Sequence, residues 1–189
     1  MSPAKRTRTV KSPRKSDTSS AVDSIRRIVR VLRLAAQKTQ TTAGISAAQL
    51  FVLQQLGDGE ELSVNELAKR TLTDRSSVAA LVERLQEQQL VDRTTHPADR
   101  RRAVVRITGA GRRLLGQAPD APTTALLAAL RRLDRRELAT LARSLRNLSQ
   151  AMGAAEEPVS MLFAEDPATR APRRGTRSVR ERRSRAGHE

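Results

Sequence analysis

Hydrophobic residues recur with helical spacing along most of the middle of the chain. Between Asp23 and Thr39 they fall at positions i, i+3, i+4 and i+7, which predicts a first amphipathic helix. Ser46 is a suitable N-cap for a second helix. Leucines mark one face of this helix, and Gly57 and Gly59 mark its end. These two segments predict a helical beginning to the folded part of the chain.

Two further helices follow at once. Ser63 and Glu66 have the spacing of a capping box, which opens a short helix of about two turns. An uninterrupted helical pattern then runs from Asp74 to about Gln89. Its predicted buried face carries Val78, Leu81, Val82 and Leu85.

Two β-rich runs come next, at 90–95 and 103–108, around a polar, arginine-rich turn at 96–102. Two short helices, a longer helix and a basic hairpin in this order predict a winged helix-turn-helix. The major groove of B-DNA admits an α-helix and shows a distinct pattern at each base pair, and an arginine-tipped hairpin can reach the adjacent minor groove. The pattern therefore favours binding to duplex DNA.

The segment after the hairpin predicts a helical region with one break. Pro119 and Pro122 interrupt the helical pattern at 118–122, after which we expect a helix at 123–133. Asp134 and Glu137 form a second capping box and open the last helix. Apolar positions on the first and last helices form the predicted dimer seam: Ile25, Ile28, Val29, Leu32, Leu138, Leu141, Leu145 and Leu148. Part of this strip is equally suited to packing within one subunit.

Charge supports a polyanionic partner. The 189 residues include 36 Lys and Arg against 20 Asp and Glu, a formal charge of +16. We expect a disordered basic arm at 1–20, a folded domain at 21–153 with its DNA-binding lobe at about 45–110, and a mostly disordered arginine-rich tail at 154–189. Arg26, Arg30 and Arg33 are better explained as a solvated helix face than as DNA contacts.

Several classes of function are disfavoured. Cysteine is absent and the only histidines are His96 and His188, so we expect no metal site, no cofactor and no thiol chemistry. No nucleophile triad or phosphate-binding loop indicates an enzyme. Only Phe51 and Phe163 could stack on bases, which disfavours single-stranded nucleic acid. No apolar run could cross a membrane, and we expect a cytoplasmic, nucleoid-associated protein.

Four short motifs occur in a fixed order: ISAAQL at 45–50, VNELA at 64–68, SVAALVERL at 77–85 and LVDR at 90–93. A wing pattern follows, Asp99-x-Arg101 and then Val105-x-Ile107-Thr108 and Gly111, which is the most specific of the set. With these motifs, the chain from about 22 to 152 resembles the MarR (multiple-antibiotic-resistance regulator) family of winged-helix transcription factors. The resemblance implies an obligate homodimer that binds a pseudo-palindrome and, in many relatives, releases it when a small molecule or an oxidant is sensed.

The resemblance also implies which residues meet DNA. Arg101 is the wing residue expected in the minor groove, and the early turns of the 74–89 helix form the recognition helix. The full set of candidate DNA-binding residues is Ser63, Asp74, Arg75, Ser76, Ser77, Ala80, Arg84, Arg93, Arg100, Arg101 and Arg102. Arg75 suits guanine, whereas Ser76 and Ser77 could instead serve as hydrogen-bond fillers of the first helical turn. Arginines 100–102 could also be a solvated turn.

These observations lead to one functional prediction and one alternative. The prediction is a homodimeric transcriptional regulator, in the first place a repressor, with an effector of unknown identity. The alternative is a nucleoid-associated or architectural protein of low sequence specificity, which the two basic tails favour. The apolar cluster at 159–163 is expected to cap the dimerisation region, with docking of a partner as the second interpretation.

Overall fold

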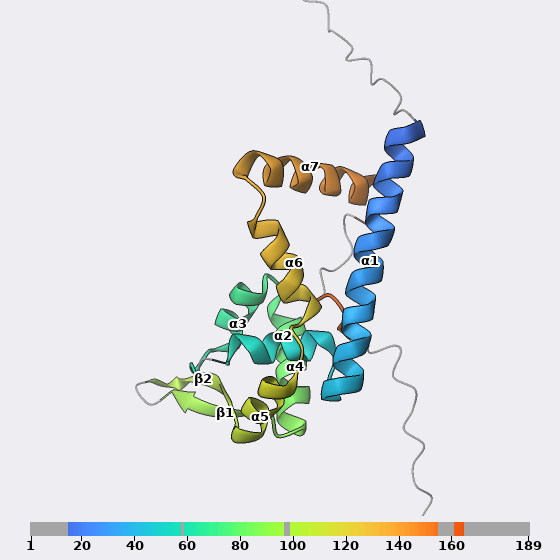
Figure 1. Ribbon diagram of the computed structural model, residues 1–189. Coiled ribbons are helices and arrows are strands. Elements are labelled where there is room, and N and C mark those ends of the chain that lie inside the picture. Colours follow the sequence, from blue (N-terminus) through green and yellow to red (C-terminus); the bar gives the residue numbers. More distant parts are fainter. Residues whose placement is uncertain (1–14, 58, 97–98, 155–160, 165–189) are drawn as a thin grey trace, which may run out of the picture.

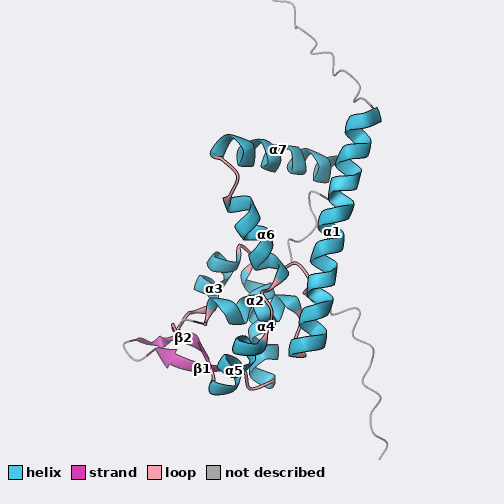
Figure 2. Cartoon of the chain, in the orientation of Figure 1, coloured by secondary structure: helices cyan, strands magenta, loops and turns pink. Residues whose placement is uncertain are grey.

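Helices dominate the described part of the chain, in which one two-stranded sheet follows the fourth helix (Figures 1 and 2). The computed structural model describes residues 15–57, 59–96, 99–154 and 161–164. Its elements are α1 (Lys15–Ala43), α2 (Ala47–Gln55), α3 (Val64–Thr71), α4 (Arg75–Glu87), β1 (Val91–His96), β2 (Asp99–Ile107), α5 (Gly109–Gln117), α6 (Pro122–Arg131) and α7 (Arg135–Ala151). This order confirms the predicted mainly helical winged fold.

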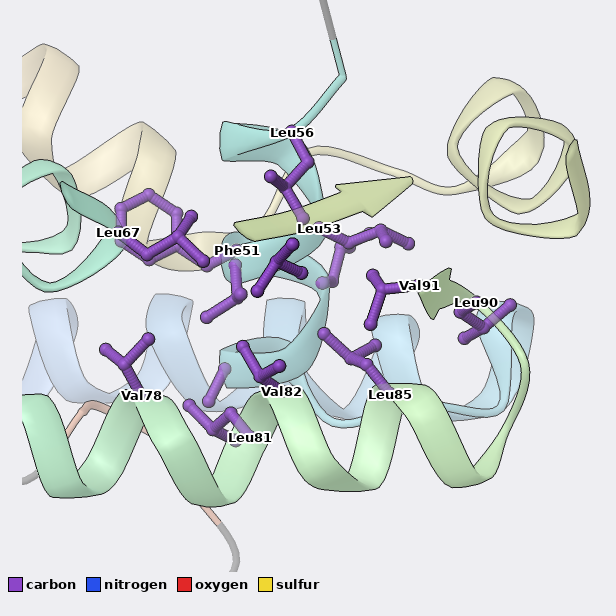
Figure 3. Close-up of a cluster of buried hydrophobic side chains, with 14 of the residues drawn as sticks. Phe51, Leu53, Leu56, Leu67, Val78, Leu81, Val82, Leu85, Leu90 and Val91 are labelled. Atoms are coloured by element: carbon purple, nitrogen blue, oxygen red, sulfur yellow. The ribbon is translucent and has the colours of Figure 1, made fainter. Parts of the chain in front are cut away.

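The hydrophobic core lies where α2, α3 and α4 pack against one another. Figure 3 shows Val78, Leu81, Val82 and Leu85 of α4 pointing toward α2, and all four are at most 2% exposed. The helical spacing of these positions puts them on one face, so burying that face fixes the opposite side of α4 toward solvent. We call the unit of α2 to α5 with the hairpin the lobe.

The hairpin is attached to this core at its base. β1 and β2 pair antiparallel, from Val91 opposite Ile107 to Thr95 opposite Ala103, and the register shifts between Thr95 and His96. Leu62, just before α3, forms an isolated bridge with Val105 through two backbone hydrogen bonds of 3.1 and 2.8 Å. The helix-turn-helix and the hairpin therefore share one core.

The remaining long helices are almost uncovered. α1 buries only Thr39 and α7 buries no residue, while α6 contacts both α1 and α2. Figure 1 shows α1 and α7 extending away from the lobe, with α6 leading from the lobe toward α7. None of the described helices is both long and apolar enough to span a bilayer.

Two boundaries differ from the sequence predictions. α1 begins at Lys15 and ends at Ala43, so it takes in residues 15–20 of the predicted arm; Asp17 in its first turn is favourable at the positive end of the helix dipole. β2 begins at Asp99, so the backbone of arginines 100–102 is part of a strand rather than of the turn. The rest of both predicted tails, 1–14, 155–160 and 165–189, lies outside the described residues.

The predicted break between helices is confirmed at 118–121, with Pro122 opening α6. The cluster at 159–163 differs from its prediction. Met161 is 4% exposed and belongs to the core of the lobe, whereas Leu162 is 45% exposed and Val159 lies outside the described residues. Met161 and Ala164 thus pack with the core of the lobe, where a flexible methionine side chain can fill gaps between apolar neighbours.

Candidate nucleic-acid interface

The helix-turn-helix is formed by α3, the turn at 72–74 and α4. Ser63 Oγ accepts from the Glu66 amide at 3.3 Å, and Glu66 Oε2 accepts from the Ser63 amide at 2.8 Å. This reciprocal cap fixes the start of α3, as the sequence predicted. Ser63 is half-buried and its hydroxyl also donates to Glu66, so in this structure its hydrogen bonds serve the cap.

Asp74 caps α4 and organises its first turn. Its carboxylate accepts hydrogen bonds from the Ser77 amide at 2.8 Å, from Ser77 Oγ at 2.6 Å and from Ser76 Oγ at 2.5 Å. These bonds, those from the two hydroxyls first, hold the pKa of Asp74 far below its ordinary value, so the carboxylate is charged at neutral pH. Ser76 and Ser77 therefore donate hydrogen bonds within the first turn of α4. This agrees with the interpretation that they serve the helix start, which the sequence offered beside a role in DNA contact.

The outer side of α4 begins with one long basic side chain and continues with small ones. Arg75, Ser76 and Ala80 are exposed, and Ala79 is half-buried. Arg84 is half-buried and engaged in an interaction within the protein. A surface of this kind lets the helix backbone approach a groove floor closely while Arg75 reaches ahead of it.

The hairpin stands beside α4 and presents further cations. Arg93 of β1 is exposed and lies opposite Val105 of β2. Arg106 pairs with Glu61 at 3.5 Å, near the base of the hairpin. Arginines 100–102 continue along β2 away from this base, and their side chains lie outside the described part of the structure. Their predicted groove contacts therefore stay predictions.

An open depression of about 770 Å³ lies at the turn between the two helices. Its lining combines residues from α3, the turn and the first turn of α4: Ala68, Lys69, Leu72, Thr73, Asp74, Ser76 and Ser77. Leu72 is the residue that sequence reasoning missed. It has a left-handed backbone, φ 54° and ψ 40°, and is 72% exposed. Its position in the turn, between Thr71 and Thr73, was the only signal for it in the sequence.

The predicted dimer seam is exposed in the single chain. Ile25, Ile28, Leu145 and Leu148 are between 41% and 52% exposed. Val29 and Leu138 are 37% and 39% exposed, and Leu32 and Leu141 are half-buried. Most of this strip is therefore not covered within the single chain. No group of three or more potential metal ligands occurs among the described residues.

Comparison with known proteins finds similarities that are concentrated in this lobe. A family model described as MarR family matches residues 43–102. The transcriptional repressor NicR of Pseudomonas putida is 35% identical over 71 residues, which are 38% of this chain and 45% of NicR. The transcriptional repressor MdtR of Bacillus subtilis is 37% identical over 68 residues, which are 36% of this chain and 44% of MdtR.

The matched stretches thus span less than half of either relative's length. A larger part of the fold matches the crystal structure of Sco3205 from Streptomyces coelicolor, a MarR family transcriptional regulator in complex with DNA. The TM-score is 0.51 at 23% identity, covering 74% of this chain and 91% of Sco3205. This likeness shows the winged-helix fold.

Proposed function

We propose that this chain, whose residues 43–102 match the MarR family, is a homodimeric transcriptional repressor that binds a pseudo-palindromic operator in duplex DNA. One observation carries the proposal. The exposed first turn of α4 and the basic hairpin are attached to the same core, with the hairpin base bonded to the residue that precedes α3 by two positions. A protein that contacts the major groove and the adjacent minor groove at once needs a fixed spacing between its recognition helix and its wing.

Base reading is assigned to the first two turns of α4. Arg75 suits the O6 and N7 acceptors of guanine, and the small side chains of Ser76 and Ala80 allow close approach. Arg101 on β2 is proposed to enter the minor groove, where a narrow A·T-rich sequence attracts a guanidinium. Lys69, Arg93 and the remaining wing arginines then supply phosphate contacts, which fix register without selecting sequence.

The occupant of the exposed seam is a second copy of the chain. Each leucine-sized side chain that leaves water contributes roughly 1.5 to 3 kcal/mol. The seam has members on both α1 and α7, and a twofold arrangement lets the same surface cover itself. It also sets two α4 helices facing successive major grooves, about one helical turn apart.

The test begins with selection of an operator from a random duplex pool, followed by titration of operator and base-scrambled duplex at one stated salt concentration. We expect a strong preference for the operator, a twofold-symmetric footprint and a dimer by light scattering. Equal binding to both duplexes, or a monomer at micromolar concentration, would refute the proposal.

Arg101→Ala tests the wing within the same assay. Removal of one minor-groove guanidinium per subunit should weaken operator binding about tenfold or more, with the dimer unchanged. Arg106→Ala is the matched control on the same strand, because Arg106 is occupied with Glu61 near the hairpin base. Equal affinities of the two variants would count against the wing assignment.

The alternative, a DNA-coating architectural protein, is favoured by one observation, the thirteen Lys and Arg residues in segments 1–14 and 165–189. Cations on such arms neutralise phosphates regardless of sequence. A variant lacking both segments separates the two functions. A repressor keeps its preference for operator over scrambled duplex, whereas a coating protein loses most of its binding.

A small-molecule effector, if the repressor uses one, is proposed to sit between the lobe and the dimerisation helices. Thr123 Oγ1 is buried there without a hydrogen-bond partner, on the helix α6 that contacts both α1 and α2. An effector found by screening for release of operator DNA should act at higher concentration on Thr123→Val. An unchanged concentration dependence would place the effector elsewhere.

A further inference from the structure

Leu72 has a combination of backbone and side-chain features that the fold does not explain. It is the C-cap of α3 and has a left-handed backbone, a conformation in which the Cβ atom of an L-residue crowds the following carbonyl. The turn needs this conformation, because the Thr73 amide reaches the Ala68 carbonyl at 3.1 Å. Glycine is the residue that usually occupies such a position without strain.

Packing does not compensate the strain. Thr71, immediately before Leu72, is 4% exposed and Leu67 is fully buried, yet Leu72 is 72% exposed. Within the described part of the lobe, it is the only large apolar side chain that is exposed. The other exposed ones lie on α1, on α7 and its cap, and in the 161–164 segment. A strained residue with an exposed apolar side chain indicates a role outside folding.

The position of Leu72 indicates where that role lies. It lines the same open depression as Ser76 and Asp74 of the first turn of α4 and as Lys69 of α3. Leu72 therefore stands beside the end of the helix that is proposed to enter the major groove, next to a cation suited to a phosphate. An apolar group at this place meets only one apolar group on the base edges, the C5-methyl of thymine.

We propose that Leu72 contacts the C5-methyl group of a thymine in each half-site and so selects thymine over cytosine at that position. This inference rests on the proposed function, since it adds a specificity residue to the same DNA-binding surface. It also accounts for a leucine where the backbone favours glycine, because glycine could not reach the methyl group.

The test measures melting temperature and operator affinity, which would change in the same direction if Leu72 had only a structural role. Leu72→Gly in the full chain should relieve the left-handed strain and raise the melting temperature by about 2 to 6 °C. The same variant should bind the operator about tenfold more weakly per half-site. Leu72→Ala should lose the same affinity without the gain in stability, since alanine keeps the Cβ atom.

Gln89→Gly is the matched control. Gln89 is also left-handed, with φ 59°, and exposed, but it follows the C-terminal end of α4. Its replacement should raise the melting temperature similarly and leave operator affinity unchanged. If Leu72→Gly binds the operator as tightly as Gln89→Gly does, the proposal is overturned.

The DNA side of the interaction is tested by replacing each operator thymine in turn with deoxyuridine, which removes only the methyl group. At one position per half-site, we expect replacement of thymine by deoxyuridine to weaken binding of the wild type. This loss should be about as large as the loss that Leu72→Gly causes on the unmodified operator. The same replacement should leave binding of the Leu72→Gly variant unchanged. Equal losses in both proteins at every position would overturn the thymine contact. Failure of the proposed function is recognised separately, because the wild type itself would then not distinguish operator from scrambled duplex.

Discussion

Gly111 lies where α5 approaches the base of the hairpin closely. A Cβ atom built on Gly111 would lie 2.3 Å from the Leu90 carbonyl oxygen and 2.8 Å from Ile107 Cγ1. The first of these atoms is backbone and cannot rotate away. The glycine of the wing motif is therefore needed for packing between α5 and the strands.

Gly111→Ala should lower the free energy of unfolding by about 1 to 3 kcal/mol, because the hairpin base must shift. Gly116→Ala on the same helix is the control. No atom lies within 4 Å of the Cβ position there, so it should gain up to about 1 kcal/mol from helix propensity. Urea denaturation measures both, and equal effects of the two substitutions would contradict the packing argument.

Asp74 gives a pH prediction. Hydrogen bonds lower its folded-state pKa below the ordinary value of 3.8, so its contribution is complete above that value and is lost as the pH falls. Asp74→Ser keeps an N-cap oxygen that does not titrate. The stability of the wild type relative to the variant should therefore fall below about pH 4. A constant difference between their urea midpoints from about pH 7 to about pH 2 would show that Asp74 does not titrate in this way.

Residues whose role depends on near neighbours in the sequence were predictable. Residues whose role depends on contact with segments distant in the sequence were not. Ser63 with Glu66, and Asp134 with Glu137, were recognised as capping boxes because the pattern lies within four residues of sequence. The left-handed strain of Leu72 has no such signature. Gly111 was noted as part of a motif, but its reason, close approach to Leu90, depends on a neighbour twenty-one residues away.

At the scale of elements, α7 is the clearest case of a helix that is amphipathic yet uncovered in the single chain. Leu145→Glu places a charge in the proposed seam and should shift the dimer toward monomer by about tenfold or more in dissociation constant. Asn147→Glu is the control, since position 147 is about 200° around the helix from position 145. Light scattering at graded concentrations measures both. A dimer equally stable in both variants would place the interface elsewhere.

Element boundaries were less predictable than the elements. Hydrophobic spacing located the core-facing part of α1, but no apolar periodicity marks Lys15–Val22, where Asp17 and uninterrupted backbone hydrogen bonding extend the helix. The same limit applies to β2, whose first residues are charged rather than β-branched. Asp99 pairs with His96 of β1 and Ala103 pairs with Thr95, so residues 100–102 continue a strand that charge and propensity do not indicate.

For the whole molecule, charge outside the lobe should control affinity rather than specificity. Removing segments 1–14 and 165–189 takes away thirteen Lys and Arg residues but leaves α1 intact. The slope of log K against log salt should become shallower by about 0.9 for each phosphate that these segments neutralise in the full chain. Fluorescence anisotropy between about 50 and about 300 mM salt measures the slope. An unchanged slope would show that the tails do not touch DNA.

The backbone bridge between Leu62 and Val105 has a consequence for how such a protein can diverge. Because it joins the wing to the helix-turn-helix, the two parts that are proposed to contact DNA keep their mutual distance whenever the lobe moves. In the proposed dimer, exposed positions of α4 can therefore change which bases are preferred, while α1, α6 and α7 independently set the separation of half-sites. New target sequences and new regulatory inputs can then evolve through different substitutions, without each disturbing the other.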